Sequence, residues 1–466
     1  ADAPVGLVTL TLAAPDAGAP GCEGTTCVDG ECLERCEVEG AACLSSGAAG
    51  VCRDGACCTG CWNGESCLPG TPAVELSAGE TFTCMRTGDG RVACWGSNGQ
   101  GELGDGTRGG TTSASWRADA RTLDVPEGTI FSSVVAGVAS GYAIDTEGGL
   151  WAWGWNRRGQ LGLGDAAIDV NAFSPVRVPH PLGSAWDRVV APHTHDDRID
   201  PDLHACAFSR GELWCWGANE EGQVDPTQAV SARDAIVSSP RRIEGLFADV
   251  AITQRATCAI LMDGAGVSCW GDNTRGTLGT GDAEPRAGIV PVPLPDDAGR
   301  IVELAGGVAG FCARSEVGRV FCWGDAVATS LPLEPGTLVR AVAEAPTLSM
   351  AVAASTEDER LAVGRGHGGA LTGGAPWVWG SNVDGRLALG AAAVGSTLPP
   401  GPTAAYPGVP ATTRELRVGS YHTCARLDDG TLACAGANDL GQLGVPMTRP
   451  VEPEWQRYCP CIDCGL

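Results

Sequence analysis

The stretch CWGSNGQGELG (94–104) decides the fold of this chain, because related segments recur along most of its length. The other copies are AWGWNRRGQLG (152–162), CWGANEEGQVD (215–225), CWGDNTRGTLG (269–279), CWGDAVATSL (322–331), VWGSNVDGRLALG (378–390) and CAGANDLGQLG (434–444). Their Trp positions, with Ala435 standing in for the last, are 95, 153, 216, 270, 323, 379 and 435. A period of roughly 55 residues predicts an array of seven structural repeats.

Each repeat carries the signals of β-structure. A hairpin such as TFTCMRTGDGRVACWG (81–96) precedes the Trp, with an Asp/Gly turn between two short runs. Pieces such as SPVRVP (174–179) and IVPVPLP (289–295) follow it, and their Pro residues suit edge strands, which need fewer backbone donors. About four strands in each of seven units predict an all-β, seven-bladed β-propeller over residues 71–450.

These units resemble the repeats of the regulator of chromosome condensation family, and we identify the chain as a secreted, bacterial-type member. The resemblance rests on W-G-x-N-x-x-G-Q-L-G at this spacing and implies a seven-bladed propeller. Two blades depart from the pattern. The fifth copy loses the motif after Gly324, and the sixth contains STEDERLAVGRGHGGALTGGAPW (355–377), which we interpret as an insertion. We expect irregular loops on both.

The blade cysteines occur in couples, one on each arm of a hairpin. Five blades carry both members: Cys84 and Cys94, Cys206 and Cys215, Cys258 and Cys269, Cys312 and Cys322, Cys424 and Cys434. Blade two has Ala143 and Ala152 at the positions we take as equivalent, and blade six has about Ala351 and Val378. Because no blade carries a single cysteine, we predict five cross-strand disulfides.

A second group of cysteines crowds residues 21–70, which we predict to be a small disulfide-rich module. Its ten cysteines are Cys22, Cys27, Cys32, Cys36, Cys43, Cys52, Cys57, Cys58, Cys61 and Cys67. The segment has few bulky apolar residues, so it needs covalent bridges in place of a core. Five internal bridges are expected, but their connectivity cannot be deduced from the spacing.

The tail, residues 451–466, holds the last three cysteines, Cys459, Cys461 and Cys464. A disulfide that pins the tail is the simplest interpretation, with a zinc or redox Cys-x-x-Cys as the weaker alternatives. The chain has 23 cysteines, an odd number, so one thiol is free or bonded to another chain. We therefore treat the tail as a candidate for an intermolecular thiol.

Composition and charge limit the class of partner and the cellular compartment that we expect for this chain. With 56 acidic and 31 basic residues the formal charge is −25, which would repel nucleic-acid phosphates. No apolar run approaches the length of a membrane span. The cysteine content and the start at Ala1 without a Met are what a secreted, mature chain would show, so we expect an extracellular, cell-surface or periplasmic location.

The sequence does not decide which terminus closes the ring. Propellers commonly close by letting one terminus complete a blade that the other terminus mainly forms. Residues 1–20 read as a strand, Val5–Leu12, followed by a linker. Either that strand or the tail after Val451 would supply the missing strand, and pairing of Val5–Leu12 with a neighbouring molecule would link subunits in series.

Candidate binding sites are few. His193-Thr194-His195-Asp196-Asp197 with His204 is a possible metal cluster, although surface-loop polarity is the simpler interpretation. His204 and His422 each stand two residues before a blade Cys and are expected to pack and hydrogen-bond.

We predict no cofactor, with calcium at Gly104-Asp105-Gly106 as a weaker alternative. The Trp residues outside the repeat register are candidates for partner binding: Trp116, Trp155 and Trp186.

The leading functional hypothesis is a non-catalytic extracellular propeller that binds a protein partner or assembles with itself. The chain lacks a Gly-rich phosphate loop and a G-x-S-x-G nucleophile elbow. A secreted bacterial propeller that inhibits β-lactamase is similar in physical terms, and it implies the alternative of a soluble inhibitor or ligand-binding propeller. An enzyme with a site at the propeller mouth is the third hypothesis.

Overall fold

We describe the chain from a computed structural model. The structure describes seven short strands between residues 26 and 68, and then residues 72–458 apart from 109–114, 197–202, 228–234, 326–337, 345–360, 373–374, 403–412, 429 and 446–449. Contacts divide the chain into two compact units, residues 1–59 and 60–466.

The strands before residue 72 form three small antiparallel sheets. β1 (Thr26–Val28) pairs with β2 (Glu31–Leu33), β3 (Ala42–Ser45), β4 (Ala48–Arg53) and β5 (Ala56–Cys58) form the second sheet, and β6 (Cys61–Trp62) pairs with β7 (Cys67–Leu68). The side chains of the ten cysteines predicted to form bridges here lie outside the described part of the chain, as does Val5–Leu12.

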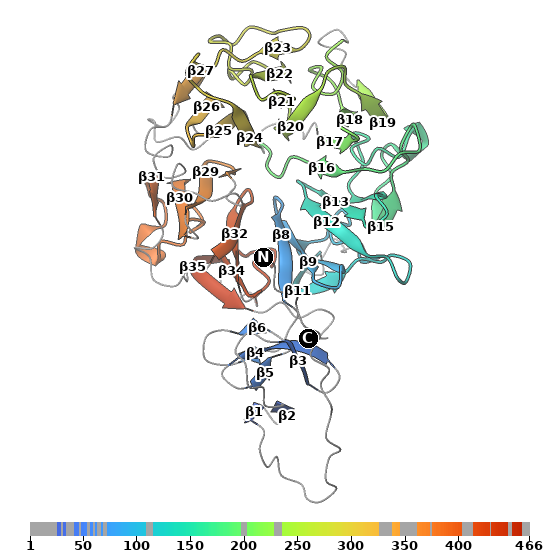
Figure 1. The fold of residues 1–466 in the computed structure, drawn as a ribbon, viewed down its shortest axis with the longest axis vertical. Coiled ribbons are helices and arrows are strands. Elements are labelled where there is room, and N and C mark those ends of the chain that lie inside the picture. Colours follow the sequence, from blue (N-terminus) through green and yellow to red (C-terminus); the bar gives the residue numbers. More distant parts are fainter. Residues whose placement is uncertain are drawn as a thin grey trace, which may run out of the picture. The chain divides into compact units, whose positions relative to one another are not determined.

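The rest of the chain forms seven four-stranded antiparallel sheets arranged around a ring (Figure 1). Blades one to three are β8 (Ala73–Ala78), β9 (Phe82–Thr87), β10 (Val92–Ser97) and β11 (Trp116–Thr122); β12 (Phe131–Ala136), β13 (Ser140–Asp145), β14 (Leu150–Gly154) and β15 (Ala172–Arg177); and β16 (Arg188–Val190), β17 (His204–Ser209), β18 (Glu212–Ala218) and β19 (Ile236–Arg242).

Blades four and five are β20 (Phe247–Ile252), β21 (Ala256–Leu261), β22 (Val267–Gly271) and β23 (Val290–Pro291); and β24 (Ile301–Gly306), β25 (Gly310–Ser315), β26 (Val320–Asp325) and β27 (Leu338–Glu344). Blades six and seven are β28 (Ala362–Val363), β29 (His367–Thr372), β30 (Ala375–Ser381) and β31 (Thr397–Pro402); and β32 (Thr413–Val418), β33 (His422–Leu427), β34 (Leu432–Ala437) and β35 (Val451–Tyr458). The prediction of an all-β, seven-bladed propeller is confirmed.

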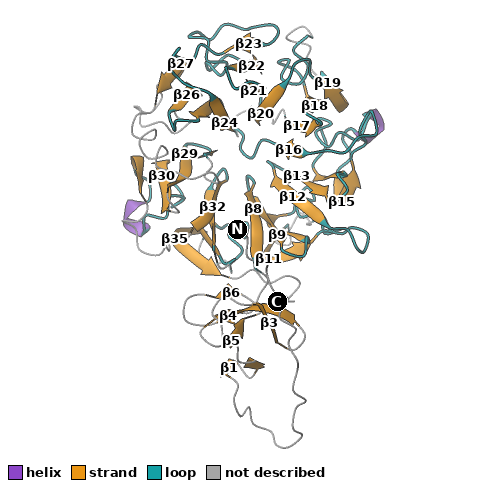
Figure 2. Ribbon diagram, viewed as in Figure 1, coloured by secondary structure: helices purple, strands orange, loops and turns teal. Residues whose placement is uncertain are grey.

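Helical structure in the described chain is limited to two short 3-10 helices, η1 (Asp165–Ala167) and η2 (Ala391–Ala393), which lie in the loops before the outermost strands of blades two and six (Figure 2). No helix of the described chain has the length and apolar character that crossing a membrane requires.

The ring closes without exchange of strands between the termini. Every blade consists of four consecutive strands, from β8–β11 in blade one to β32–β35 in blade seven. The expectation that one terminus completes a blade formed by the other is therefore wrong. The tail does provide β35, but as the outermost strand of its own repeat, and blade seven then packs directly against β8 of blade one.

The repeated glycine after each Trp is required by the backbone. Gly96 has a φ of +111°, and a Cβ added to it would lie 2.6 Å from Phe82 Cα on the neighbouring strand. The equivalent glycine has a positive φ in all seven blades: Gly154, Gly217, Gly271, Gly324, Gly380 and Gly436 in the others. This is the conformation that L side chains rarely adopt, so the glycine is present in every copy, including blade seven, where Ala435 replaces the Trp.

The register corrects two assignments made from the sequence. In blade two Tyr142 lies opposite Ala152, so Tyr142, and not Ala143, stands where other blades have their first Cys. In blade six Val378 lies opposite Gly369, so Gly369 takes that place, and not Ala351. Residues 362–372 of the supposed insertion are the inner strands β28 and β29 of that blade. The irregularity expected after Gly324 falls on 326–337, outside the described residues.

We predict that Gly96→Ala lowers the free energy of unfolding by about 2 kcal/mol, because the methyl group meets fixed backbone in a left-handed conformation. Chemical denaturation of the oxidised protein measures this. Gly99→Ala is the matched control, since nothing lies within 4 Å of a Cβ at Gly99. Equal stability of the two variants would contradict the argument.

Candidate functional site

Five disulfides link the second and third strands of individual blades. They join Cys84 to Cys94, Cys206 to Cys215, Cys258 to Cys269, Cys312 to Cys322 and Cys424 to Cys434, with Cα atoms 4.0–4.1 Å apart. These are the couples predicted from the sequence. Each sulfur pair is buried in the layer between blades, so the bridge is part of the core as well as a covalent link.

The tryptophans of the repeat join adjacent blades. For five of them the buried indole Nε1 donates a hydrogen bond to a backbone carbonyl in the Asn-x-x-Gly-x-Leu loop, or its Val variant, of the preceding blade, which places the loop against the next sheet. The described pairs are Trp95 to Gln442 (3.1 Å), Trp153 to Glu102 (2.8 Å), Trp216 to Gln160 (2.7 Å), Trp270 to Gln223 (2.9 Å) and Trp323 to Thr277 (3.0 Å). The pair Trp95–Gln442 thus closes the ring with the same contact that joins blades one to five to one another.

The repeat asparagine shapes that loop. In six blades its side-chain oxygen accepts the N–H of the Leu or Val five residues later, for example Leu161 to Asn156 at 3.0 Å. This bond closes the loop and exposes the carbonyl between them to the next blade's Trp. The spacing N-x-x-G-x-L is therefore a loop that prepares a hydrogen-bond acceptor.

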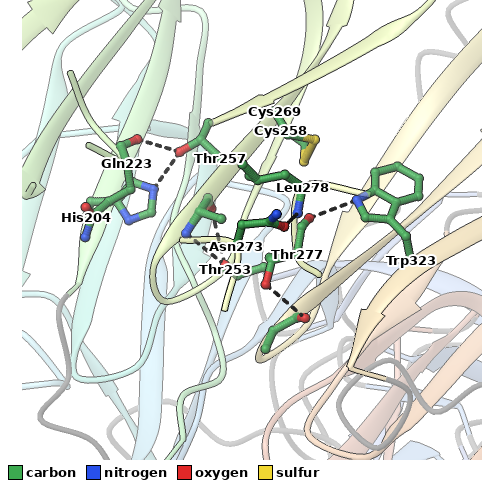
Figure 3. The surroundings of a disulfide bond; sticks show 12 residues. His204, Gln223, Thr253, Thr257, Cys258, Cys269, Asn273, Thr277, Leu278 and Trp323 are labelled. Atoms are coloured by element: carbon green, nitrogen blue, oxygen red, sulfur yellow. Dashed lines mark hydrogen bonds between the residues drawn. A yellow bond between two sulfur atoms is a disulfide. The ribbon is translucent and has the colours of Figure 1, made fainter. Parts of the chain in front are cut away.

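Buried histidines add a second contact across the seams (Figure 3). His204 Nε2 lies 2.8 Å from Thr257 Oγ1, and that hydroxyl donates to the Gln223 carbonyl at 2.8 Å. His422 makes the same arrangement with Thr83 at 2.9 Å across the closing seam. Because each hydroxyl donates onward to a carbonyl, the histidine Nε2 is the protonated nitrogen. The packing and hydrogen-bonding role predicted for His204 and His422 is confirmed.

The seam between blades six and seven lacks the usual Trp, because Ala435 occupies its position. Arg386 is buried there and donates from Nη1 to the carbonyls of Arg365 and Ser420, both at 2.8 Å. Trp455, on the outermost strand β35, packs in the same apolar cluster as Ala435. A buried cation and an indole from another strand thus fill a seam that other blades fill with the repeat Trp.

The innermost strands enclose a central channel of about 400 Å³ that all seven blades line. Acidic side chains on these strands accept the backbone N–H of the next blade's innermost strand. Glu303, for example, accepts from Leu361 N at 2.7 Å and pairs with Arg314 at 2.6 Å. Glu75, Asp249 and Glu415 act in the same way toward Val134, Leu304 and Leu76. These carboxylates are therefore occupied by hydrogen bonds that join the innermost strands of neighbouring blades.

One segment crosses the mouth of this channel. In six blades a three-residue turn joins the innermost strand to the second, but in blade three residues 191–203 separate β16 from β17. We name residues 191–196 the crossing segment. His193 Nε2 donates to the Val363 carbonyl of blade six at 2.8 Å, and Ser420 Oγ of blade seven lies 3.5 Å from the His193 carbonyl.

The other end of the crossing segment reaches different blades. His195 Nδ1 contacts Glu80 of blade one. Asp196 N donates to Gln254 Oε1 of blade four at 3.0 Å, and its carboxylate pairs with Arg275 at 2.5 Å. Because its partners belong to blades one, four, six and seven, the segment closes one face of the channel. We call this the plugged face. The opposite side, where the hairpin turns between second and third strands lie, is the hairpin face.

These contacts correct the interpretation of the histidine cluster as surface-loop polarity. The Asp196 side chain is only 3% exposed, and His193, His195 and His204 point to separate partners. Within the described residues no three His, Cys, Asp or Glu side chains are placed to hold a metal ion. Asp197 lies outside the described residues. The signal that sequence analysis missed was length, since the 63 residues between Trp153 and Trp216 are the longest interval.

In the turn Gly104-Asp105-Gly106, which we considered as a calcium site, the Asp105 carboxylate contacts residues of its own blade. Asp105 Oδ1 accepts from the backbone N and the hydroxyl of Thr107, at 3.0 Å and 2.6 Å, and Oδ2 lies 3.6 Å from Arg121 Nε. Together these contacts hold the turn against the outermost strand of blade one.

The three tryptophans considered for partner binding do not share one environment. Trp186 is buried, 3% exposed, and packs edge-on against Trp214 with ring centroids 6.3 Å apart. It is therefore core, and its assignment as a surface contact is wrong. Trp116 at the start of β11 and Trp155 after β14 are half-buried, and their role stays a prediction. The tail cysteines Cys459, Cys461 and Cys464 lie outside the described residues.

Three stretches of the chain match a known repeat, the regulator of chromosome condensation (RCC1) repeat, at residues 73–102, 147–195 and 415–442. The chain is a seven-bladed β-propeller of RCC1 repeats. The first and last of these stretches lie on either side of the closing seam, and the middle one enters the crossing segment.

Two relatives give the extent of the similarity. The ultraviolet-B receptor UVR8 of Arabidopsis thaliana is 27% identical over 261 residues, which are 55% of this chain and 54% of UVR8. The X-linked retinitis pigmentosa GTPase regulator homologue of Caenorhabditis elegans is 24% identical over 365 residues, 70% of this chain and 24% of that protein. The chain thus spans about half or less of these relatives.

Solved structures agree on the fold of this RCC1-repeat propeller. Human WBSCR16 superposes with a TM-score of 0.63 at 20% identity, covering 79% of this chain and 94% of its own. Prp20p from Saccharomyces cerevisiae gives 0.61 at 17% identity, covering 83% and 87%. At these identities the likeness concerns the fold alone.

The buried seam histidines make stability depend on pH. Burial lowers the pKa of both His204 and His422 to about 3. Between that value and about 6.5 the unfolded chain binds protons that the folded chain does not, so stability falls as the pH falls through this window. We predict that His422→Gln reduces the slope of unfolding free energy against pH by up to about 1.4 kcal/mol per pH unit. Urea unfolding between pH 5 and 7 measures it, and an unchanged slope would refute the assignment.

We predict that Arg275→Ala loosens the crossing segment, because the buried Asp196 carboxylate loses its cation. The expected cost is about 2 kcal/mol, with faster hydrogen exchange confined to residues 191–196, their blade-four contacts and the end of β26, where Arg275 also pairs with Asp325 at 3.4 Å. Arg286→Ala is the control, since Arg286 forms an exposed pair with Asp282 on the same blade. If both variants exchange like the parent protein, the ion pair does not hold the segment.

Proposed function

We propose that this propeller is a non-catalytic extracellular protein that binds a protein partner or assembles into a larger surface structure. The observation that carries the proposal is the set of five intra-blade disulfides within a ring of RCC1 repeats. RCC1-like propellers are protein-interaction scaffolds, and the structure of Prp20p was described together with its binding to Gsp1p and histones.

The disulfides support an oxidising compartment, either extracellular or periplasmic. Cross-strand bridges of this kind form and persist where thiols are not kept reduced. The charge of −25 points to partners other than nucleic acid. Secretion by a bacterium and attachment at the cell surface are part of the proposal.

A ligand-binding or inhibitory propeller is the second candidate, and the channel favours it. Its volume of about 400 Å³ falls in the range of small-ligand pockets, and the crossing segment covers it on the plugged face. The carboxylates that line the channel argue against this candidate. They already accept hydrogen bonds from backbone N–H groups and pair with arginines, so they have little capacity left for a ligand.

Native protein isolated from its source without reducing agent tests the proposal. We expect the ten blade cysteines to resist iodoacetamide until dithiothreitol is added, and light scattering with covalent cross-linking to show a complex larger than one chain. The control is the same material unfolded and refolded under oxidising conditions, which keeps the fold and loses the partner. A monomer with no cross-linked protein, or blade thiols that react without reduction, would overturn it.

A further inference from the structure

The exposed large hydrophobic side chains of the described chain favour the hairpin face. Eight of thirteen lie there, at strand starts, hairpin turns or the segments entering a blade: Val74, Ile130, Leu182, Leu246, Leu261, Met262, Val302 and Val317. Isolated apolar residues on a surface need no explanation. A group of them on neighbouring loops does, because contiguous apolar area marks interaction sites.

Three of these residues lie on neighbouring turns of blades four and five. Leu246 is 63% exposed, Met262 45% and Val317 59%. Met262 N donates to the Leu246 carbonyl at 3.0 Å, which fixes the first two side by side. The adjoining backbone bonds, Ile301 N to Gly264 O at 2.9 Å and Glu316 N to Arg300 O at 2.8 Å, tie the hairpins of both blades to the segment between them.

The same loops carry exposed acidic groups beside the apolar ones. Glu244 precedes Leu246 by two residues, Asp263 follows Met262, and Glu316 precedes Val317; all three are exposed. Arg300 is the exposed base between the two hairpins, so these four side chains sum to −2. These turns therefore present three apolar and three acidic side chains side by side along the chain, with Arg300 between the two hairpins, on backbone that hydrogen bonds hold in place.

We propose that Leu246, Met262 and Val317, with Glu244, Asp263 and Glu316, form a docking patch for a polypeptide that presents an apolar anchor flanked by Lys or Arg. The inference rests on the proposed function and names the chemistry of its partner. Charge complementarity selects this occupant, because a second copy of the chain, with a formal charge of −25, a nucleic acid or an anionic membrane would bring like charge to these three carboxylates.

Synthetic peptides of one length test the patch directly. One carries alternating Leu and Lys clusters, a second has Glu in place of Lys, and a third has Ser in place of Leu. We expect the Leu/Lys peptide to bind, and the other two to bind at least ten-fold more weakly. The triple variant Leu246→Ser, Met262→Ser, Val317→Ser should weaken the first peptide at least ten-fold, and Glu244→Gln, Asp263→Gln, Glu316→Gln should also flatten its salt dependence.

A matched control uses the plugged face. Val170, Val383 and Val394 are 59%, 56% and 41% exposed in loops there, so changing all three to Ser removes similar apolar area. We expect this variant to bind like the parent, with the same unfolding midpoint as the patch variant. Equal loss in both triple variants, or none in the patch variant, would overturn the patch. Self-association that the patch variant abolishes would show a second copy as the occupant and overturn it too.

The two proposals fail separately. If native partners still cross-link to the patch variant, the patch is wrong and the interaction function stands. If the Leu/Lys peptide binds as expected but native material proves monomeric without partners, the patch is a real binding surface and the proposed function is wrong.

Discussion

The hydrogen bond from a buried Trp indole to a loop carbonyl of the preceding blade is the contact that joins the blades at five described seams, including the one that closes the ring. It requires the Trp, the positive-φ glycine after it, and an asparagine that closes the loop so that the carbonyl faces outward. A separate blade is a four-stranded sheet with two apolar faces, which cannot stay exposed in water. Stacking blades through this contact buries both faces, and after seven blades the first and last meet through the pair Trp95–Gln442.

Disulfides and histidines reinforce different parts of this arrangement. The disulfides act within blades and constrain the unfolded chain over short loops, where the entropy estimate is roughly 2.7 kcal/mol per bridge. The histidines act between blades and stay neutral because they are buried. Blade two, without a disulfide, places Tyr142 at the position of the first Cys, and its hydroxyl donates to the Gln160 carbonyl at 2.7 Å. The position on the second strand that holds a disulfide-bonded Cys in five blades is therefore filled by a hydrogen-bonded Tyr in blade two.

The two faces of the ring differ because only blade three extends its first turn. The crossing segment uses polar contacts to four other blades and leaves the plugged face with an ordered, largely neutralised centre. The hairpin face keeps short turns with exposed apolar and acidic side chains. This asymmetry covers the channel on one face and leaves the hairpin face as the one on which we propose a docking patch.

The sequence by itself determined the fold class, the blade number and the blade disulfides, because each depends on residues within one repeat. Cys258 and Cys269 are 11 positions apart across a single hairpin, so spacing alone predicts their pairing. The tertiary structure decided everything that depends on the ring. His193 and Val363 meet across 170 positions, Trp186 is buried where the connection into blade three packs against Trp214, and Leu246 and Val317 lie on neighbouring turns because blades four and five are adjacent. A local pattern determines a blade, whereas closure of the ring determines which distant loops share a face.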